Sequence, residues 1–500
     1  MSTTSMLLQG GTVLVHDADD SVKAIKADLL IEGKIITKIE ENIEAPARAE
    51  IIDCKDKIVC PGFIDTHHHV WQTLLKGRHA NQLLLDYMYT GNFTSSLHSP
   101  SDIFWGQLGG CMECLEVGTT TVVDHSPINY SPQHSLAAVA ATVCSGIRSI
   151  YCYCPTSRVQ TWTPFTLNPN LLEDWVLQTF DSLASKAPYG QGRVQIGFAF
   201  DSWYQPRETI VNLFAKVKAA GVKLITSHVV RNAITGLHSV PQIMHNYGLL
   251  DSSVLLSHAT GSTKACIDLI REANCHISTT PSTEFQAALG SPVALDPELD
   301  IQSQCGLGID CHSYNSASIA SEMRTLLQSA RGAHYQPFLD YEKVPGKAYK
   351  SVEDVFNLGT IGSARAAGME KEIGSLAVDK LADILIFDCL SPGMVCAAQL
   401  DPVAAIVLHS HPGDIEMVIV DGVVRKKERK LLDIDLNPGN EIWSDTGKNG
   451  GIVCWKEVSK ELQGRQMELG KKIDELDMDE ARKGLIKAFR IDESKLVSTT

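Results

Sequence analysis

Residues 6–60 alternate apolar and polar positions between turn signals, which is typical of short antiparallel strands. After residue 61 the pattern changes, and short β-branched apolar runs recur between longer spacers rich in helix-forming residues. The runs lie at 63–66, 119–124, 148–153, 194–200, 222–227, 254–257, 275–279 and 306–309. Eight strands that alternate with helices predict a (β/α)8 barrel, the TIM barrel, whose chemistry lies at the carboxyl ends of its strands.

The alternating strand pattern returns near the end of the chain, at 373–376, 382–388 and 417–424. We therefore predict an α/β protein in which residues 1–60 and 372–450 pair into a small β-sandwich domain. The barrel, residues 61–371, would be inserted between these two segments. Residues 451–500 are predicted to be a helical tail that packs on the barrel or on a partner subunit. Its imperfect apolar stripe consists of Val458, Leu462, Met467, Leu469, Ile473 and Leu476.

Composition narrows the class of protein. The 500 residues are 44% hydrophobic and 21% charged, which is ordinary for a globular enzyme. A net charge of −15 argues against binding to nucleic acid or to anionic membranes, because both require basic surfaces. No apolar stretch approaches the ~20 residues of a membrane-spanning helix. The 14 cysteines follow no short-period framework, so we expect reduced thiols and a cytoplasmic protein.

Three consecutive histidines follow the first barrel run, at His67, His68 and His69. Successive side chains on a strand alternate in direction, so His67 and His69 should share one side while His68 points away. Two imidazoles side by side can chelate one divalent metal. A triple histidine alone also fits a surface loop, but the strand before it and the partners below favour a metal site.

Polar residues also stand at the ends of four other predicted strands. These residues are His125, His228, His258 and Asp310, after strands two, five, six and eight. A single strand-end histidine is more often a core or loop residue, but the strand ends of a barrel converge on one site. The predicted ligands of one divalent metal are His67, His69, His228 and Asp310. Three nitrogens and a carboxylate suit zinc and also tolerate iron or manganese.

The predicted ligand set suggests a hydrolytic reaction. A metal of this kind lowers the pKa of a bound water toward ~7 and so supplies hydroxide near neutral pH. Asp310 beside that water can accept its proton, and His258 can hold the substrate oxygen or a developing oxyanion.

The segment Pro61-Gly62-Phe63-Ile64-Asp65-Thr66-His67-x-His69, with His228, His258 and Asp310 at later strand ends, resembles the amidohydrolase superfamily. The likeness covers nearly the whole chain and is greatest to the cytosine deaminase-like and chlorotriazine hydrolase-like branch. It implies a single zinc or iron and the displacement by water of an amine or other leaving group from a nitrogen heterocycle. Gln72, in the segment after the histidine pair, also looks like this branch.

One position departs from the pattern of that branch. Its deaminases place a glutamate three residues after the strand-five histidine, where this chain has Arg231. Arginine cannot shuttle a proton, because its pKa exceeds ~12. Glu284, after strand seven, is the nearest candidate carboxylate, although a helix N-terminal carboxylate stabilised by the helix dipole fits it equally well. Arg231 could bind an anionic or carbonyl-rich substrate, or form a surface salt bridge. No lysine closes strand four at residues 198–203, which disfavours a binuclear site bridged by a carbamylated lysine.

We therefore predict a hydrolase with one divalent metal per chain, zinc by preference, that acts on a C–N bond of a small cyclic substrate. Hydrolytic deamination of a nitrogen heterocycle is the favoured reaction. The alternatives are an amide or lactone hydrolase or a lyase that uses the same metal site, and a non-catalytic family member. Asp310, His258 and Glu284 are the predicted catalytic residues, and Gln72, His125 and Arg231 the predicted substrate contacts. We also expect a homodimer or higher homo-oligomer.

Overall fold

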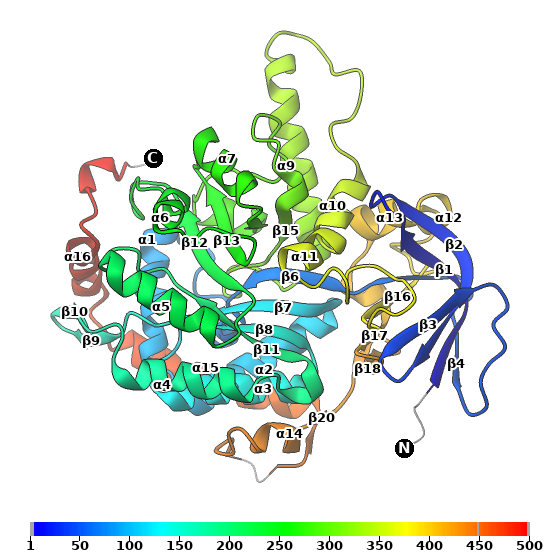
Figure 1. Cartoon of the computed structure of the whole chain (residues 1–500), viewed down its shortest axis with the longest axis horizontal. Helices are drawn as coiled ribbons and strands as arrows, with labels where there is room; N and C mark the ends of the chain where they lie inside the picture. The colour runs from blue at the N-terminus through cyan, green and yellow to red at the C-terminus, as the bar shows by residue number, and fades with distance from the viewer. Residues whose placement is uncertain (1–4, 448–449, 498–500) are drawn as a thin grey trace.

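The computed structural model describes residues 5–447 and 450–497, and the parts of the predicted segments 1–60, 372–450 and 451–500 that fall outside these ranges are not described. Eight strands form a parallel sheet that curves into a barrel with helices around it, which confirms the predicted fold (Figure 1). In chain order the barrel strands are β6 (Phe63–His68), β7 (Thr119–Ser126), β8 (Arg148–Tyr153), β11 (Val194–Ala199), β12 (Ile225–Val230), β13 (Val254–Thr260), β14 (His276–Thr279) and β15 (Cys305–Leu307).

The barrel closes through backbone contacts next to the predicted ligands. His68 and Asp310 form an isolated parallel bridge between the first and last strands. Within it, the amide of Asp310 donates to the carbonyl of His67 over 2.7 Å, and the amide of His69 donates to the carbonyl of Asp310 over 2.9 Å. Gly308 permits this close approach, because a Cβ atom there would lie 2.8 Å from the backbone nitrogen of His67. Barrel closure therefore brings His67, His69 and Asp310 together.

A second, nine-stranded sheet draws its strands from both ends of the chain, as predicted. The two ends meet where β16 pairs antiparallel with β5. Side chains of both groups, among them Leu8, Val59, Ile384 and Met417, share one hydrophobic cluster. The strands are β1 (Ser5–His16), β2 (Val22–Glu32), β3 (Ile35–Glu40), β4 (Glu50–Asp53), β5 (Lys57–Pro61), β16 (Ile384–Asp388), β17 (Ile415–Val420), β18 (Val423–Lys427) and β19 (Lys430–Leu431). The residue bounds of the domains stay a prediction.

Helices cover the outside of the barrel and connect its strands. The main ones are α2 (Pro100–Glu116), α3 (Pro132–Ser145), α4 (Asp174–Lys186), α5 (Arg207–Ala219), α6 (Val240–Tyr247), α7 (Lys264–Glu272), α8 (Pro281–Gln286), α9 (Ile319–Leu339), α10 (Val352–Leu358) and α11 (Ile361–Ala366). The upper part of α9 and the loop after it project from the body as an arm (Figure 1). Among the described residues, no helix is both long enough and apolar enough to cross a membrane.

The predicted helical tail consists of two helices, α15 (Trp455–Asp474) and α16 (Met478–Phe489). The Asp477 carboxylate accepts a hydrogen bond from the amide of Glu480 and begins the second helix. Val458, Leu469 and Ile473 of α15 are buried against the same chain, whereas Met467 is 65% exposed. At 3.6 residues per turn, Met467 lies half a turn away from Val458, which explains why the stripe is imperfect.

Candidate metal centre

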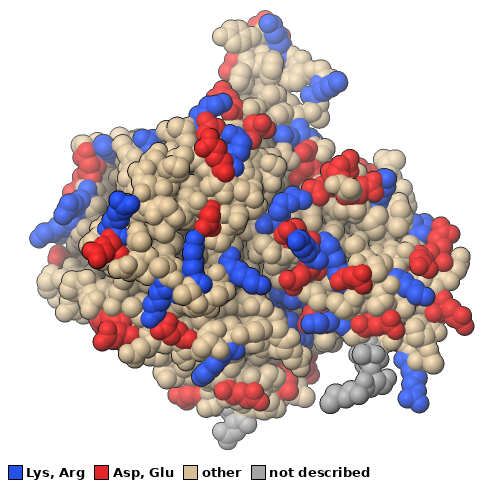
Figure 2. Space-filling view, viewed as in Figure 1, with Lys and Arg blue, Asp and Glu red and all other residues tan. Residues whose placement is uncertain are grey.

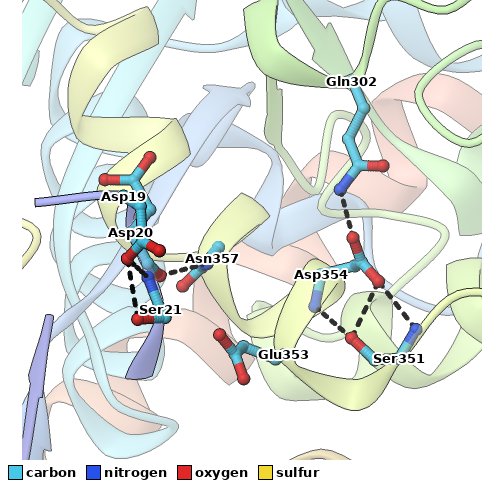
Figure 3. Close-up of a pocket in the computed structure, with 8 residues that line it drawn as sticks. All are labelled: Asp19, Asp20, Ser21, Gln302, Ser351, Glu353, Asp354 and Asn357. Atoms are coloured by element: carbon cyan, nitrogen blue, oxygen red, sulfur yellow. Dashed lines mark hydrogen bonds between the residues drawn. The ribbon is translucent and has the colours of Figure 1, made fainter. Parts of the chain in front are cut away.

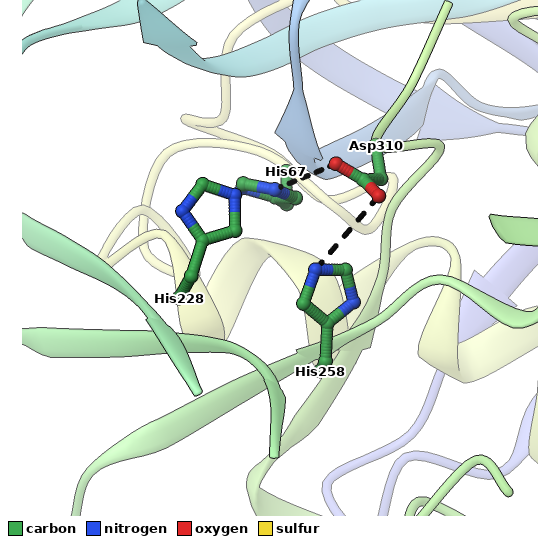
Figure 4. Close-up of side chains that lie close together, drawn as sticks. All are labelled: His67, His228, His258 and Asp310. Carbon is green, nitrogen blue, oxygen red and sulfur yellow. Dashed lines mark hydrogen bonds and ion pairs between the residues drawn. The ribbon is translucent and has the colours of Figure 1, made fainter. Parts of the chain in front are cut away.

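Three of the predicted ligands, His67, His228 and Asp310, lie close together beside His258 (Figure 4). The Nε2 atoms of His67 and His69 each lie 3.1 Å from Oδ1 of Asp310. His68 points the other way and its Nδ1 lies 2.6 Å from a carboxylate oxygen of Asp65. The strand alternation thus separates two imidazoles that face Asp310 from one that contacts Asp65 and His312. Asp310 itself has a φ of 66°, an uncommon value for a residue other than glycine.

Two further histidines complete the cluster from neighbouring strands. Nε2 of His228, on β12, lies 3.3 Å from Nε2 of His69. Nε2 of His258, on β13, lies 3.8 Å from Oδ2 of Asp310. The pairing of β12 with β13 skips Ala259, and His258 has a φ of 74°, so a local irregularity of the strand sets the direction of this imidazole. One nitrogen or oxygen each of His67, His228, His258 and Asp310 lies within 4.8 Å of all the others.

The outer nitrogens of the imidazoles determine which atoms face inward. Nδ1 of His69 lies 2.6 Å from the backbone carbonyl of His125, and Nδ1 of His228 lies 3.0 Å from a carboxylate oxygen of Asp201. Both partners can only accept, so each Nδ1 carries a proton and donates it. The two Nε2 atoms then present lone pairs to each other across 3.3 Å, an arrangement that requires a proton or a metal cation between them.

This donor set fits zinc. Zn–N bonds of 2.0–2.1 Å in a tetrahedron separate two ligand nitrogens by ~3.3–3.4 Å, close to the spacing of His69 and His228. The third imidazole, His67, is held at its outer nitrogen by the Ser257 hydroxyl over 2.8 Å. Metal-binding histidines usually have such a partner on the nitrogen away from the metal. His67, His69, His228 and Asp310 can therefore supply three nitrogens and one carboxylate oxygen.

Burial and neighbouring charges give His67 and Asp310 the protonation states that ligands need. Burial holds the pKa of His67 well below its ordinary value, which keeps its imidazole neutral. Burial alone would raise the pKa of Asp310, but the imidazoles of His258, His67 and His69 outweigh it and hold that pKa well below the usual range. Asp310 is therefore an ionised carboxylate at neutral pH.

A buried carboxylate lies behind His258. Oε1 of Glu284 is 3.5 Å from Nδ1 of His258, and the Thr280 hydroxyl is 2.9 Å from the same nitrogen. Oε2 of Glu284 has no hydrogen-bond partner within the described part of the chain, and burial raises the pKa of this carboxyl. Glu284 lies in the first turn of α8, and Glu322 accepts hydrogen bonds from the amide and hydroxyl of Ser282 in the same turn. Burial raises the pKa of Glu322 to about 7.

Asp201 was not among the predicted site residues. It follows β11, the fourth barrel strand, and its Oδ2 accepts from His125 and His228 over 3.0 Å in each case. Burial alone would raise its pKa, but the two imidazoles outweigh that effect and hold the pKa well below the usual range. The one signal in the sequence for this role is that Asp201, like the predicted ligands, lies at the carboxyl end of a barrel strand.

The predicted substrate contacts lie at different places. His125 is fully buried, and its two ring nitrogens bond the Thr226 hydroxyl and Asp201. Gln72 is also buried and donates to the Tyr87 hydroxyl over 2.5 Å. Arg231 follows β12, and its Nε donates to the carbonyl of Leu237 over 2.9 Å within the same loop. Contact with substrate stays a prediction for all three residues.

A separate pocket of about 230 Å³ lies between the β1–β2 turn and α10 (Figure 3). Its acidic side chains already serve local structure. Asp354 accepts from Ser351 as a helix cap and from Gln302 over 2.8 Å, and Asp19 accepts from Ser21. On the face shown in Figure 2, positive and negative side chains are interspersed. Because the acidic side chains of this pocket already have partners within the chain, the strand ends that carry the histidine cluster are the candidate site.

Comparison with known proteins is consistent with this geometry. Residues 58–425 match the model of the amidohydrolase family. A 5-methylthioadenosine/S-adenosylhomocysteine deaminase of Acetivibrio thermocellus is 27% identical over 446 residues, which cover 86% of this chain and 96% of that protein. A 5'-deoxyadenosine deaminase of Methanobrevibacter smithii is 27% identical over 467 residues, which cover 90% of this chain and 99% of that protein.

Two solved structures share the fold. An adenosine deaminase from Xanthomonas campestris with bound zinc aligns with a TM-score of 0.74 at 17% identity, over 94% of this chain and 99% of that one. An atrazine chlorohydrolase from Arthrobacter aurescens in complex with zinc aligns with a TM-score of 0.72 at 19% identity, over 88% of this chain and 99% of that one.

Proposed function

From the premise that this chain belongs to the amidohydrolase family, we propose that it is a zinc-dependent deaminase of an aminopurine nucleoside. The observation that carries the proposal is the pair of inward-facing nitrogens of His69 and His228, 3.3 Å apart beside the Asp310 carboxylate. The relatives named as deaminases hydrolyse a carbon–nitrogen bond, and the prediction of a metal-dependent C–N hydrolase is confirmed.

The ligand set would hold one metal ion per chain through His67, His69, His228 and Asp310. A zinc ion bound there would act as a Lewis acid and make hydroxide available near neutral pH. The protein fixes the four donors in advance, because each lies at or next to the end of a barrel strand whose position the sheet determines.

Asp310 and His258 would handle the proton of the attacking water. The ionised Asp310 accepts this proton as the water oxygen bonds to the ring carbon that carries the amino group. Nε2 of His258 lies 3.8 Å from Asp310 and would stabilise the oxygen that adds to the ring carbon or pass the proton on. The amine, once protonated, leaves as ammonia and the ring carbon keeps the new oxygen.

The proton shuttle would differ from that of related deaminases. Position 231 carries arginine, and its guanidinium is held by the carbonyl of Leu237. Glu284 is buried, has a raised pKa and contacts Nδ1 of His258 at 3.5 Å. A buried carboxyl with a raised pKa is suited to both accept and donate a proton. We therefore assign the shuttle to Glu284 acting through His258.

The substrate class follows from the relatives. Proteins named as deaminases of 5-methylthioadenosine, S-adenosylhomocysteine and 5'-deoxyadenosine align over most of this chain. The test is to measure ammonia release from these compounds, adenosine and cytosine by the zinc-loaded protein, with Asp310→Asn as the control. Release from an adenine nucleoside is expected. Hydrolysis of amides or lactones without ammonia release from any aminated heterocycle would overturn the proposal.

We also propose that the protein is a homodimer. Much of the tail's apolar stripe is buried on its own chain, whereas the arm formed by the upper part of α9 and the loop after it carries an exposed apolar surface (Figure 1). Its exposed large apolar side chains are Phe338, Leu339, Tyr341 and Val344, at 41%, 50%, 78% and 82% exposure. Pairing of two copies is the usual way to cover such a surface. A monomeric mass by light scattering at micromolar concentration would contradict this proposal. The cytoplasmic location stays a prediction.

A further inference from the structure

We infer that Asp201 is a positioning residue that fixes the orientation of the metal ligand His228, and of His69 through His125. The inference rests on the proposed zinc site and goes beyond it, because Asp201 is not one of the four ligands.

His228 is the ligand that most needs such support. Its side chain is 30% exposed, whereas the side chains of His69 and Asp310 are 6% and 5% exposed. A buried side chain is held in place by its neighbours on all sides, but an imidazole that is one-third exposed can rotate about its side-chain bonds. A metal ligand must nevertheless keep one nitrogen directed at the metal.

Asp201 holds both the backbone and the ring of His228. Its Oδ1 accepts from the amide of His228 over 2.8 Å, and its Oδ2 accepts from Nδ1 of the same residue over 3.0 Å. The two bonds fix the ring relative to the strand and keep the Nδ1 proton in place, so that Nε2 is the free donor atom. The Ser227 hydroxyl, itself bonded by the indole of Trp203, adds a longer contact of 3.4 Å to Oδ1.

The same carboxylate connects to a second ligand through His125. Nε2 of His125 donates to Oδ2 of Asp201 over 3.0 Å, and the Thr226 hydroxyl bonds the other ring nitrogen over 3.1 Å. The backbone carbonyl of His125 accepts the outer N–H of His69 over 2.6 Å. The rings of His125 and His228 are 4.3 Å apart between centroids, so Asp201 joins two strand ends that flank the site.

The hydrogen-bond pattern separates this role from a second metal site. His125, Asp201 and His228 do lie close enough to bind an ion between them. However, both nitrogens of His125 have hydrogen-bond partners, and both oxygens of Asp201 accept from N–H groups. Loss of such an outer carboxylate weakens metal binding by about 10- to 100-fold in other metal sites.

The test is the zinc affinity of Asp201→Asn, measured by competition with a chelator of known affinity. An asparagine is nearly isosteric but cannot accept from both imidazoles with equal strength. The matched control is Asp181→Asn, which removes an exposed carboxylate paired with Lys216. We expect zinc binding to weaken about 10- to 100-fold in Asp201→Asn and to stay unchanged in the control. The thermal unfolding temperatures of the metal-free proteins should agree closely.

Two results would overturn the inference. Unchanged zinc affinity in Asp201→Asn would remove the positioning role, even if KM rose. Two zinc ions per wild-type chain and one in the variant would make Asp201 a ligand instead. Should Asp201→Asn not fold, Asp201→Glu gives the answer, because it keeps the charge but displaces the carboxylate from the amide and Nδ1 of His228. Zinc binding should weaken in that variant as well, and unchanged zinc affinity would remove the positioning role. Zinc binding is measured without substrate, so these results are independent of which heterocycle the enzyme deaminates.

Discussion

His258 and Glu284 form a buried imidazole–carboxylate pair, with Nδ1 of His258 3.5 Å from Oε1 of Glu284. On its other side the imidazole faces Asp310 at 3.8 Å. The three groups therefore form a continuous line from the proposed base to a carboxyl whose pKa is raised by burial.

Glu284→Gln should lower ammonia release by about 10²-fold, because glutamine keeps the shape but cannot carry a proton. Arg231→Glu, assayed beside it, should not raise ammonia release, because position 231 is engaged with the carbonyl of Leu237. Initial rates of ammonia formation at saturating zinc provide the measurement. If Arg231→Glu increases the rate and Glu284→Gln leaves it unchanged, the shuttle belongs to the strand-five position as in related deaminases.

Asp310→Asn should reduce turnover by 10²-fold or more and weaken zinc binding, because it removes both the base and an anionic ligand. The backbone should not change, since asparagine tolerates the left-handed conformation that Asp310 adopts at a φ of 66°. Steady-state rates and circular dichroism provide the two measurements. A variant within ~3-fold of wild type would show that Asp310 is not the base.

The raised pKa of Glu322 should make the free energy of unfolding depend on pH. Its pKa rises from 4.5 to about 7 on folding, so the folded protein binds this proton more tightly than the unfolded chain. The contribution of the neutral carboxyl to the free energy of unfolding is complete below about pH 4.5 and is lost as the pH rises through about 7. Relative to wild type, Glu322→Gln should therefore gain stability over this range, by at most ~3 kcal/mol. Urea unfolding of both proteins from pH 5 to 8 measures the difference, and parallel pH curves would contradict the assignment.

Leu485→Ala should raise KM as well as lower stability. Leu485 of α16 is 1% exposed and packs in one cluster with Leu85 and Phe93, which flank the segment that carries Tyr87. Tyr87 in turn accepts the hydrogen bond of Gln72 beside the proposed site. We expect a loss of about 2–5 kcal/mol in the free energy of unfolding. The control is Met467→Ala on the exposed side of α15, which should change neither quantity. An unchanged KM in Leu485→Ala would show that the tail only stabilises the fold.

The barrel could be predicted because its strands are short β-branched runs in a regular alternation with helices. The metal ligands could be predicted because they lie at the ends of those strands. The role of Asp201 could not be predicted, because it depends on the distances from Asp201 to His125 and His228, which lie on other strands. Its place after a strand is the one local signal of this role, and carboxylates are common at such places. Likewise, whether the upper part of α9 and the loop after it lie on the barrel or project from it depends on packing that the sequence alone does not show.

The most direct test of the central claim is a zinc titration of the metal-free protein, followed by ammonia release from 5'-deoxyadenosine. We predict that the rate rises in proportion to added zinc and reaches its plateau at one zinc per chain, because His67, His69, His228 and Asp310 form a single donor set. Full activity without metal, or no ammonia release from any adenine nucleoside at any zinc content, would contradict the account.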